Sequence, residues 1–501
     1  MSQISYNYRD DIYRIRTIFD YKYTNRFFYV VIGSRHNGSI AGGATVMSKR
    51  TSSRNRLDDM VATLQEDILT GKRAEGEFLP SELDLGELYS LSKNTVRKGL
   101  DRLVADGYIE KVPRIGARII RKKQSSGEVL RFGYYPTLDM EVQLLELVDR
   151  FNEDNPDIRV EPIPVGYPRN QEAVGKYLSE GMVFDVMTVN LYNYEYIRSE
   201  SPEKSMLEPL DAREDLFPFL NAPFSSGGRQ YVLPFVFTPV VLCYNKEHFR
   251  EAELAEPDSG WTWDDLSAAA DKLSAGNDRL GFYFHLMSEN RWPIFLLQNG
   301  VRFERDAEGR YDMRAPLVRE AFQTCMDIVN KHFPSHLSEN DFDVLSLFLR
   351  GKASIIMASY SNLNALKEAD FEYDIAPLPH LKELRTLLVV IGLAINKTSM
   401  RKQEAKRFVD YLLSYDTQLR IRRNTLNLPS LKRAAEWVGD EPEKGRPYRF
   451  HMYRELIHTF RLYSDLNWTT SEMMTIRNEM RYYWSKLEDL DTVLERLEEK
   501  L

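Results

Sequence analysis

Three short segments between residues 76 and 121 decide how the N-terminal part of this chain is expected to fold. They read GEFLPSE at residues 76–82, SKNTVR at residues 92–97 and KVPRIG at residues 111–116. A helix start, a second helix start and a tight turn follow one another in this order. The order predicts a small domain of helices closed by a β-hairpin.

The first of these segments leads into a helix. Ser81 and Asp84 have the spacing of a capping box, in which the hydroxyl and the carboxylate satisfy backbone N–H groups at the helix start. We expect Leu85 and Leu88 to face the interior. Another helix should precede this one and stop near Gly71, because apolar residues recur at helical spacing at Leu57, Met60, Val61, Leu64 and Ile68.

The second segment begins the helix that we expect to contact a binding partner. Ser92 is placed to cap it, and Gly107 to end it. Its buried stripe should consist of Val96, Leu100, Leu103 and Val104. Polar and basic residues then occupy the first turn and the opposite face, namely Lys93, Asn94, Thr95, Arg97 and Lys98. Amide, hydroxyl and guanidinium groups in such a turn suit base edges and phosphates in the major groove of DNA.

The third segment predicts a hairpin. Residues 108–112 and 117–121 read as strands, and the turn between them carries Arg114 and Gly116 at its tip. A hairpin in this place after a polar helix is a wing. The alternative is a small domain with a purely structural role, which the three helices alone would not exclude.

Residues 50–121 together resemble the GntR-like winged-helix regulators, which share the Leu-Pro-Ser-Glu segment and the Ser-x-x-Thr-Val-Arg helix start. The resemblance implies a winged helix-turn-helix (α+β) domain that binds operator DNA. The DNA contacts that it implies are Lys93, Asn94, Thr95 and Arg97 from the helix, and Arg114 and Gly116 from the wing. Leu83 stands where many relatives have an arginine.

The distribution of charge agrees with one DNA-binding end. Residues 47–123 hold 16 Lys+Arg and 12 Asp+Glu, and residues 1–46 hold 6 and 3. Residues 124–501 hold 45 Lys+Arg and 60 Asp+Glu, a net charge of −15. The phosphates of nucleic acid repel such an acidic surface, so we expect only the N-terminal end to bind nucleic acid.

Length and composition indicate several soluble domains. A chain of 501 residues exceeds the size of one domain. It has no run of about twenty apolar residues and no charged-then-apolar export signal after Met1. Cys243 and Cys325, the two cysteines, cannot form a disulfide framework. We expect a cytoplasmic protein that makes no contact with the membrane.

Residues 1–46 follow no clear helical or strand period. Ala41-Gly42-Gly43 can be encoded by a purine-rich ribosome-binding sequence, and Met47 lies at a suitable distance after it. We therefore interpret residues 1–46 as an extension that results from a misassigned start. The alternative is a genuine arm that packs on or binds DNA.

A different pattern begins after the polar linker at residues 123–128. Residues 129–134 and 158–163 read as strands, with a helix at 141–152 between them. A second helix at 171–180 and a strand at 183–189 continue the alternation. Strands that alternate with helices predict an α/β region with parallel crossovers.

Several ordered segments in this region resemble the family 1 extracellular solute-binding proteins, the sugar receptors of ABC importers. They are RQYVLPF at residues 229–235, LCYNKEHF at 242–249, WTWDDL at 261–266, GKASIIM at 351–357 and DIAPLP at 374–379. The resemblance covers roughly residues 129–430 and implies a two-lobed α/β periplasmic-binding-protein-like domain that closes on a ligand. The absence of an export signal departs from the family.

The ligand residues are predicted from chemistry and position. A sugar site needs aromatic faces for the ring and carboxylate or amide groups for the hydroxyls, and the ends of strands are the place to look. On that basis we predict contacts from Tyr135, Asp185, Phe235, Trp292 and Tyr360. A packing role is the alternative for each. Trp261 and Trp263 are instead expected to staple a helix start, because Thr262 and Asp265 form a second capping box.

Few sequence features support a catalytic site or a metal site. His332 and His336 have the spacing of a helical metal pair, but Pro334 lies between them. No Gly-Lys-Ser/Thr follows the glycines at 38, 42 and 43, so there is no P-loop. We expect no cofactor, no metal and no enzymatic activity.

The sequence therefore predicts a multidomain regulator. Its domains are the extension at 1–46, a winged helix at 47–122, the linker at 123–128 and a two-lobed ligand-sensing domain at 129–501. We expect a homodimeric transcriptional regulator that responds to a sugar or oligosaccharide. The alternative is a solute receptor for carbohydrate transport with an incidental N-terminal domain.

Overall fold

Contacts in the computed structural model divide the chain into two units, Met1–Lys123 and Gln124–Leu501. The structure describes residues 3–8, 11–18, 28–33 and 56–501, except for 58–59, 62, 65–66, 69–72, 90, 106, 113–114, 121–127, 166–183, 201–205, 277, 334–337, 339 and 440–444. The predicted helix at 171–180 and the wing residue Arg114 lie outside the described residues. Each unit is considered by itself.

The first unit begins with a three-stranded antiparallel sheet in the order β1-β2-β3. Its strands are β1 (Gln3–Tyr8), β2 (Asp11–Ile18) and β3 (Phe28–Gly33). These segments are rich in Tyr, Ile, Val and Phe, the residue types that strands favour. The sequence analysis found no strand period in this region, although β1 alternates between polar and apolar residues.

The rest of the first unit follows the predicted order of helices and hairpin. Described residues between 56 and 68 are helical. They precede α2 (Glu82–Leu88), α3 (Lys93–Ala105), and the antiparallel hairpin of β4 (Ile109–Val112) and β5 (Gly116–Ile119). The predicted capping box of Ser81 and Asp84 is confirmed. One core, formed by Met60, Leu64, Leu85, Val96, Leu100, Leu103 and Ile109, joins these elements.

Two residues that we expected in this core are exposed. Leu88 is 69% exposed and Val104 is 37% exposed. Since α2 is only seven residues long, Leu85 alone is buried on it, and Leu88 lies at its end. On α3 the buried stripe is narrower than predicted and ends at Leu103.

The second unit is built on one twisted sheet whose strand order is β12-β13-β11-β15-β8-β6-β7. The predicted parallel pairing is confirmed for β6 with β7 and with β8. β11 and β15 run antiparallel to each other through the middle. The strands are β6 (Glu128–Tyr134), β7 (Ile158–Pro164), β8 (Val186–Asn190), β9 (Ser225–Ser226), β10 (Arg229–Gln230), β11 (Leu233–Asn245), β12 (Leu280–Tyr283), β13 (Ala353–Ser359), β14 (Tyr373–Ala376), β15 (Thr386–Ile395), β16 (Leu428–Pro429) and β17 (Phe460–Arg461).

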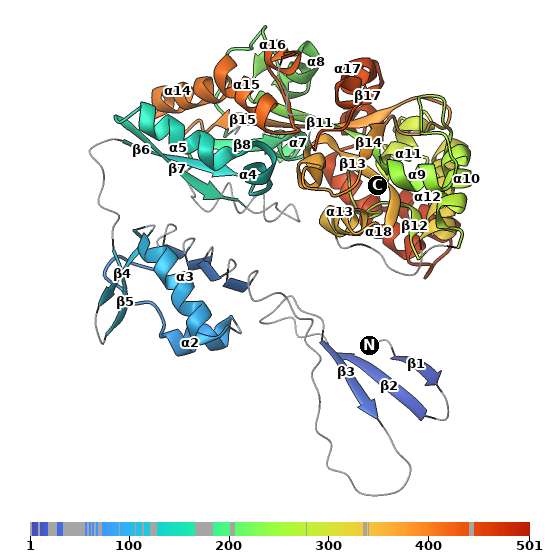
Figure 1. The fold of residues 1–501 in the computed structure, drawn as a ribbon, viewed down its shortest axis with the longest axis horizontal. Helices are drawn as coiled ribbons and strands as arrows, with labels where there is room; N and C mark the ends of the chain where they lie inside the picture. The colour runs from blue at the N-terminus through green and yellow to red at the C-terminus, as the bar shows by residue number, and fades with distance from the viewer. Residues whose placement is uncertain are drawn as a thin grey trace, which may run out of the picture. The chain divides into compact units, whose positions relative to one another are not determined.

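Helices cover this sheet in two groups, which Figure 1 shows as two lobes of the second unit. The first lobe contains α4 (Thr137–Val142), α5 (Leu144–Asp154), α7 (Leu191–Glu200), α8 (Pro218–Asn221), α14 (Lys402–Leu412), α15 (Tyr415–Asn424) and α16 (Lys432–Ala435). The second contains α9 (Lys246–Glu251), α10 (Trp263–Ser274), α11 (Pro293–Gln298), α12 (Pro316–His332), α13 (Asp341–Leu349), α18 (Thr470–Trp484) and α19 (Leu490–Lys500), together with the short η3 (Tyr360–Leu366), α17 (Tyr453–Leu456) and η6 (Tyr463–Leu466).

Each lobe has its own hydrophobic core, and β11 passes through both. The start of β11, with Leu233 and Phe235, packs into the core of the first lobe. Its later part, with Val240 and Leu242, packs into the core of the second lobe. Every residue of β11 is buried. Because this strand crosses from one core to the other, it fixes how the two lobes are joined.

One predicted helix is divided in the structure. The expected helix at 141–152 is replaced by α4 and α5, which meet at Gln143 with a left-handed φ of 56°. A non-glycine residue in this conformation gives no clear sequence signal. The break turns α4 away from α5 and places Glu141 against the second lobe.

Candidate DNA-binding and ligand-binding sites

The exposed first turn of α3 contains the predicted DNA contacts. Lys93 and Asn94 are exposed, and Thr95 is half-buried. The Ser92 hydroxyl accepts a hydrogen bond from the Thr95 N–H at 3.3 Å, so Ser92 caps the helix as expected. The Ser92 and Thr95 hydroxyls lie 2.8 Å apart. The turn therefore presents two exposed side chains, Lys93 and Asn94, beside Thr95, whose hydroxyl is held by Ser92.

A carboxylate from α2 lies among these basic groups. Glu82 accepts hydrogen bonds from the Arg97 Nε atom, at 3.0 Å to one oxygen and 2.9 Å to the other. The Lys93 Nζ atom lies 3.9 Å from the same carboxylate. The hydrogen bond to Glu82 raises the pKa of the Arg97 guanidinium. Glu82 was not among the predicted site residues, although it belongs to the Leu-Pro-Ser-Glu segment.

The hairpin supplies the other predicted contact that can be described. Gly116 has a φ of +146°, a backbone angle that residues other than glycine rarely adopt. A Cβ atom at Gly116 would lie 3.6 Å from the Phe78 ring. The backbone angle at the first residue of β5 therefore explains why this residue is a glycine. A contact of Gly116 with DNA stays a prediction.

Two of the five predicted ligand residues hold the first lobe together. The Tyr135 hydroxyl accepts hydrogen bonds from the Asn190 N–H at 3.2 Å and the Asn193 Nδ2 atom at 2.6 Å. The Asp185 carboxylate accepts one from the Arg131 N–H at 2.9 Å and one from the Ser399 hydroxyl at 2.5 Å. Both side chains are buried. Their polar atoms are thus satisfied within the protein.

The other three predicted residues are also buried. Phe235 lies in the core of the first lobe, and Trp292 packs against Trp484 in the core of the second. The Tyr360 hydroxyl donates to the Phe450 carbonyl at 3.0 Å. Burial favours the packing role over the binding role for all five residues, and internal hydrogen bonds support it for Tyr135, Asp185 and Tyr360.

The structure brings together a different set of polar residues where α7 of the first lobe packs against α18 of the second. The Thr470 hydroxyl of α18 donates to the Tyr192 carbonyl of α7 at 3.3 Å. Beside this contact, the Arg477 Nη1 atom lies 2.5 Å from a Glu289 oxygen. Burial raises the pKa of the Tyr192 hydroxyl, and the charges of Glu289 and Arg477 in the other lobe shift that pKa in opposite directions.

Tyr463 of the second lobe and Glu195 of the first also belong to this lobe junction. The Tyr463 hydroxyl donates a hydrogen bond to the Asn290 Oδ1 atom. Burial raises the pKa of the Tyr463 hydroxyl, and the charge of Glu195 in the first lobe acts in the same direction. Burial raises the pKa of Glu195 to about 7, and the nearby Arg198 only partly opposes the change. Aromatic, carboxylate and guanidinium groups from both lobes therefore face one another here, which is the chemistry expected of a polyhydroxyl site.

A second contact between the lobes involves α4 and η3. The Asn364 Nδ2 atom donates to the Glu141 carbonyl at 3.3 Å. Burial raises the pKa of the Glu141 carboxyl to about 7, while a hydrogen bond from Thr137 acts in the opposite direction. This contact, like the lobe junction, thus includes a glutamate that burial makes easier to protonate.

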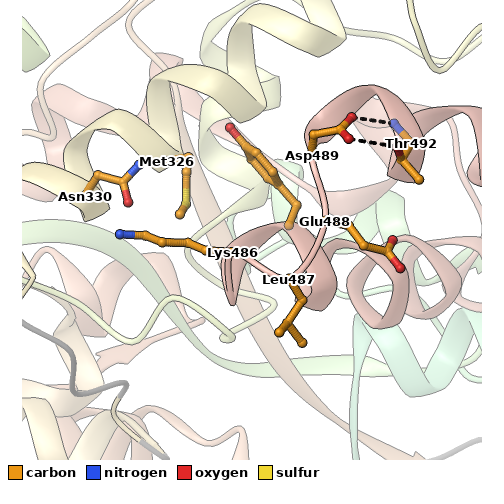
Figure 2. Close-up of a pocket in the computed structure, with 8 residues that line it drawn as sticks. Met326, Asn330, Lys486, Leu487, Glu488, Asp489 and Thr492 are labelled. Atoms are coloured by element: carbon orange, nitrogen blue, oxygen red, sulfur yellow. Dashed lines mark hydrogen bonds between the residues drawn. The ribbon is translucent and has the colours of Figure 1, made fainter. Parts of the chain in front are cut away.

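Two surface hollows lie away from the lobe junction. One, of about 470 Å³, lies between α12 and the turn that joins α18 to α19. Figure 2 shows Asp489 bonded to Thr492, and Lys486 extending toward the side where Asn330 lies. The other, of about 430 Å³, lies beside α14 and is spanned by the Lys402–Glu208 ion pair. The carboxylates that line the two hollows cap a helix or pair with lysine or arginine, and each hollow belongs to a single lobe.

The sequence contained one signal for the lobe junction. Tyr192 and Glu195 follow β8 directly, and polar residues at the end of a parallel strand are candidates for a site. Glu289 lies three residues before the predicted Trp292. Tyr463 and Arg477 belong to the C-terminal region that no recognisable motif covered, so only the fold places them here.

Comparison with known families identifies both parts of the chain. The sequence model described as bacterial extracellular solute-binding protein matches residues 139–419. The chain belongs to this solute-binding protein family. It also carries a domain of the family of bacterial regulatory proteins called gntR, which matches residues 58–119. The combination predicted from the motifs is therefore confirmed.

Individual relatives of the solute-binding protein are distant. The sn-glycerol-3-phosphate-binding periplasmic protein UgpB of Yersinia pestis bv. Antiqua (strain Antiqua) is 24% identical over 257 residues, which are 47% of this chain and 57% of that protein. A putative binding protein of Brucella abortus (strain 2308) is 25% identical over 251 residues, 47% of this chain and 60% of that protein. The chain thus spans less than two thirds of the length of these curated relatives.

Solved structures share the fold of the second unit. An ABC substrate-binding protein of Listeria monocytogenes, in complex with cycloalternan, aligns with a TM-score of 0.63 and 19% identity over 75% of this chain and 98% of that one. Maltose-bound MalE3 of T. maritima aligns with a TM-score of 0.64 and 20% identity over 74% of this chain and 98% of that one. Among the described residues, no helix has the length and apolar character needed to cross a membrane.

Proposed function

We propose that this solute-binding protein is a transcriptional regulator that binds operator DNA and responds to a sugar or oligosaccharide. The observation that carries the proposal is the presence of a GntR-family domain and a solute-binding domain in one chain. A receptor domain fused to a DNA-binding domain can change transcription when its ligand binds. Since operator DNA is its partner, the protein acts in the cytoplasm, and it has no enzymatic role.

In this proposal the residues from about 47 to 122 form a winged helix, with α3 as recognition helix and β4–β5 as wing. Lys93, Asn94, Thr95 and Arg97 contact DNA from α3, and Arg114 and Gly116 from the wing. Support comes from the exposed basic first turn of α3 and from its capping by Ser92. The protein binds as a homodimer, because one winged helix reads too few base pairs for useful selectivity.

The ligand binds at the lobe junction of the region from about 129 to 501, which the segment at 123–128 links to the winged helix. Tyr192 and Glu195 contact it from the first lobe, and Glu289, Tyr463 and Arg477 from the second. Arg477 is paired with Glu289 and Arg198 lies near Glu195, so each guanidinium has a carboxylate close to it. This arrangement favours a neutral polyhydroxyl ligand over a phosphate. A saccharide, the ligand class of several solved structures with this fold, suits the junction better than sn-glycerol 3-phosphate.

Two measurements on the full chain test the proposed function. Selection from a randomised duplex DNA library should enrich one two-fold symmetric sequence, with half-sites about one helical turn apart. Calorimetric titration with maltose, mannotriose and sn-glycerol 3-phosphate should give binding by a saccharide and none by the phosphate. Saccharide binding without any selected DNA sequence would instead support the transport receptor.

A further inference from the structure

The pairing of Glu82 with Arg97 uses only one of the arginine's three nitrogen atoms. Both oxygens of Glu82 lie within 3.0 Å of the Nε atom. Neither the Nη1 nor the Nη2 atom of Arg97 makes a hydrogen bond to a described residue of the first unit. A guanidinium has five N–H groups, so four remain for another partner. The Arg97 side chain is 50% exposed, and that partner can reach it.

Glu82 is itself held in place by local structure. It is the first residue of α2, directly after Ser81, whose capping box with Asp84 fixes the start of that helix. α2 packs against α3 through Leu85 and Val96, both fully buried. A carboxylate on one fixed helix therefore holds a guanidinium on another. The pair restricts the rotamers of Arg97, whose side chain is otherwise among the most flexible.

A carboxylate on a DNA-binding face has an electrostatic cost. It repels phosphate, and here it lies near two of the cations that would attract phosphate, Lys93 and Arg97. If Arg97 simply met a phosphate, Glu82 would weaken that contact. If Arg97 reads a base, a fixed orientation of its Nη atoms is useful, because the bidentate contact with guanine O6 and N7 depends on geometry.

We propose that Glu82 is a positioning residue for DNA recognition, which holds Arg97 at Nε so that its Nη atoms read a guanine in the major groove. The inference rests on the proposed operator binding. Glu82 then has two effects on affinity. Its negative charge lowers the affinity for DNA of any sequence. By orienting Arg97 it raises the affinity for the sequence that has guanine at one position in each half-site.

The test compares Glu82→Gln with Glu87→Gln in the full chain. Both substitutions remove one negative charge from α2, but Glu87 is exposed and has no such pairing with α3. The wild-type protein first selects its sequence from a randomised duplex library. Binding of each variant is then measured on that sequence, on its single base-pair substitutions and on random DNA. Thermal unfolding checks that each variant folds.

We expect Glu82→Gln to lose about tenfold of the preference at one G·C pair per half-site, and to bind random DNA more tightly than the wild type. Arg97→Lys should lose the preference at the same pair while keeping the salt dependence of affinity, since it retains the charge without the planar fork. Glu87→Gln should keep the preference.

Three outcomes can be told apart. Unchanged base preference in Glu82→Gln, or an equal change of affinity for all sequences, would overturn the positioning role. A log–log salt slope lower by about one unit in Arg97→Ala, with no change of base preference, would make Arg97 a phosphate contact and would also overturn the positioning role. A wild-type protein that selects no sequence would contradict the proposed function instead.

Discussion

Two glutamates, Glu141 and Glu195, are the residues through which pH should act on this molecule. Burial raises the pKa of each carboxyl from an ordinary value of 4.5 to about 7. Such a group binds its proton more tightly in the folded chain, so the stability it contributes is complete below pH 4.5 and is lost as the pH rises to about 7. The loss is on the order of 3 kcal/mol per group at most.

We predict that Glu195→Gln reduces the fall in unfolding free energy of the second unit between pH 5 and pH 8. The amide cannot ionise, so the variant avoids the cost of a buried charge above neutrality. Urea unfolding at several pH values measures the effect, with Glu304→Gln as an exposed control. Equal pH dependence in the wild type and in Glu195→Gln would show that Glu195 is solvated in the folded protein.

Two tyrosines allow packing and binding roles to be separated. Tyr135→Phe removes the acceptor of two hydrogen bonds within the first lobe, one of them buried, and should destabilise the second unit by about 1–3 kcal/mol. Tyr192→Phe, at the lobe junction, should change stability less and weaken saccharide binding about tenfold, as expected for the loss of a direct hydrogen bond. Chemical unfolding and calorimetric titration of both variants check the two effects. Weaker binding in a stable Tyr135→Phe variant would restore Tyr135 as a ligand residue.

At the scale of helices and strands, the sequence predicted elements whose signals are local. The capping boxes at Ser81–Asp84 and Thr262–Asp265 are both confirmed, because their hydrogen bonds join residues three positions apart. The break at Gln143 was missed, since nothing local demands a left-handed glutamine. The lobe junction was missed for a different reason. It joins α7 to α18, which are separated by some 280 residues in the chain and meet only through the tertiary fold.

The C-terminal helices should be integral to the second lobe. α18 and α19 lie beyond the region that matches the solute-binding family, yet Met480, Leu494 and Leu497 are fully buried in that lobe's core. We predict that Leu494→Ala lowers the unfolding free energy of the second unit by about 2–5 kcal/mol. Leu487→Ala, in the adjoining turn at 73% exposure, is the matched control and should change it by less than about 0.5 kcal/mol. Similar stability of the two variants would mean that α19 detaches easily from the lobe.

On the scale of the whole molecule, the proposed regulator has to transmit a change from one unit to the other. β11 and β15 both pass through the cores of the two lobes, so a ligand at the lobe junction can move one lobe against the other about these shared strands. The predicted linker at residues 123–128 is short. In a dimer on two half-sites, closure of the lobes should therefore change how the two winged helices are spaced.

We predict that operator DNA and saccharide alter each other's affinity by an equal factor, within about 5- to 150-fold, because linkage is reciprocal. Titration of the saccharide with and without operator measures the factor. A flexible Gly/Ser insert in the linker should preserve both binding reactions and reduce their coupling, because the slack absorbs the motion. If the unmodified protein binds the saccharide tightly and equally well with and without operator, DNA affinity is not what the ligand controls. Regulation would then act after operator binding, through contacts with polymerase on the DNA.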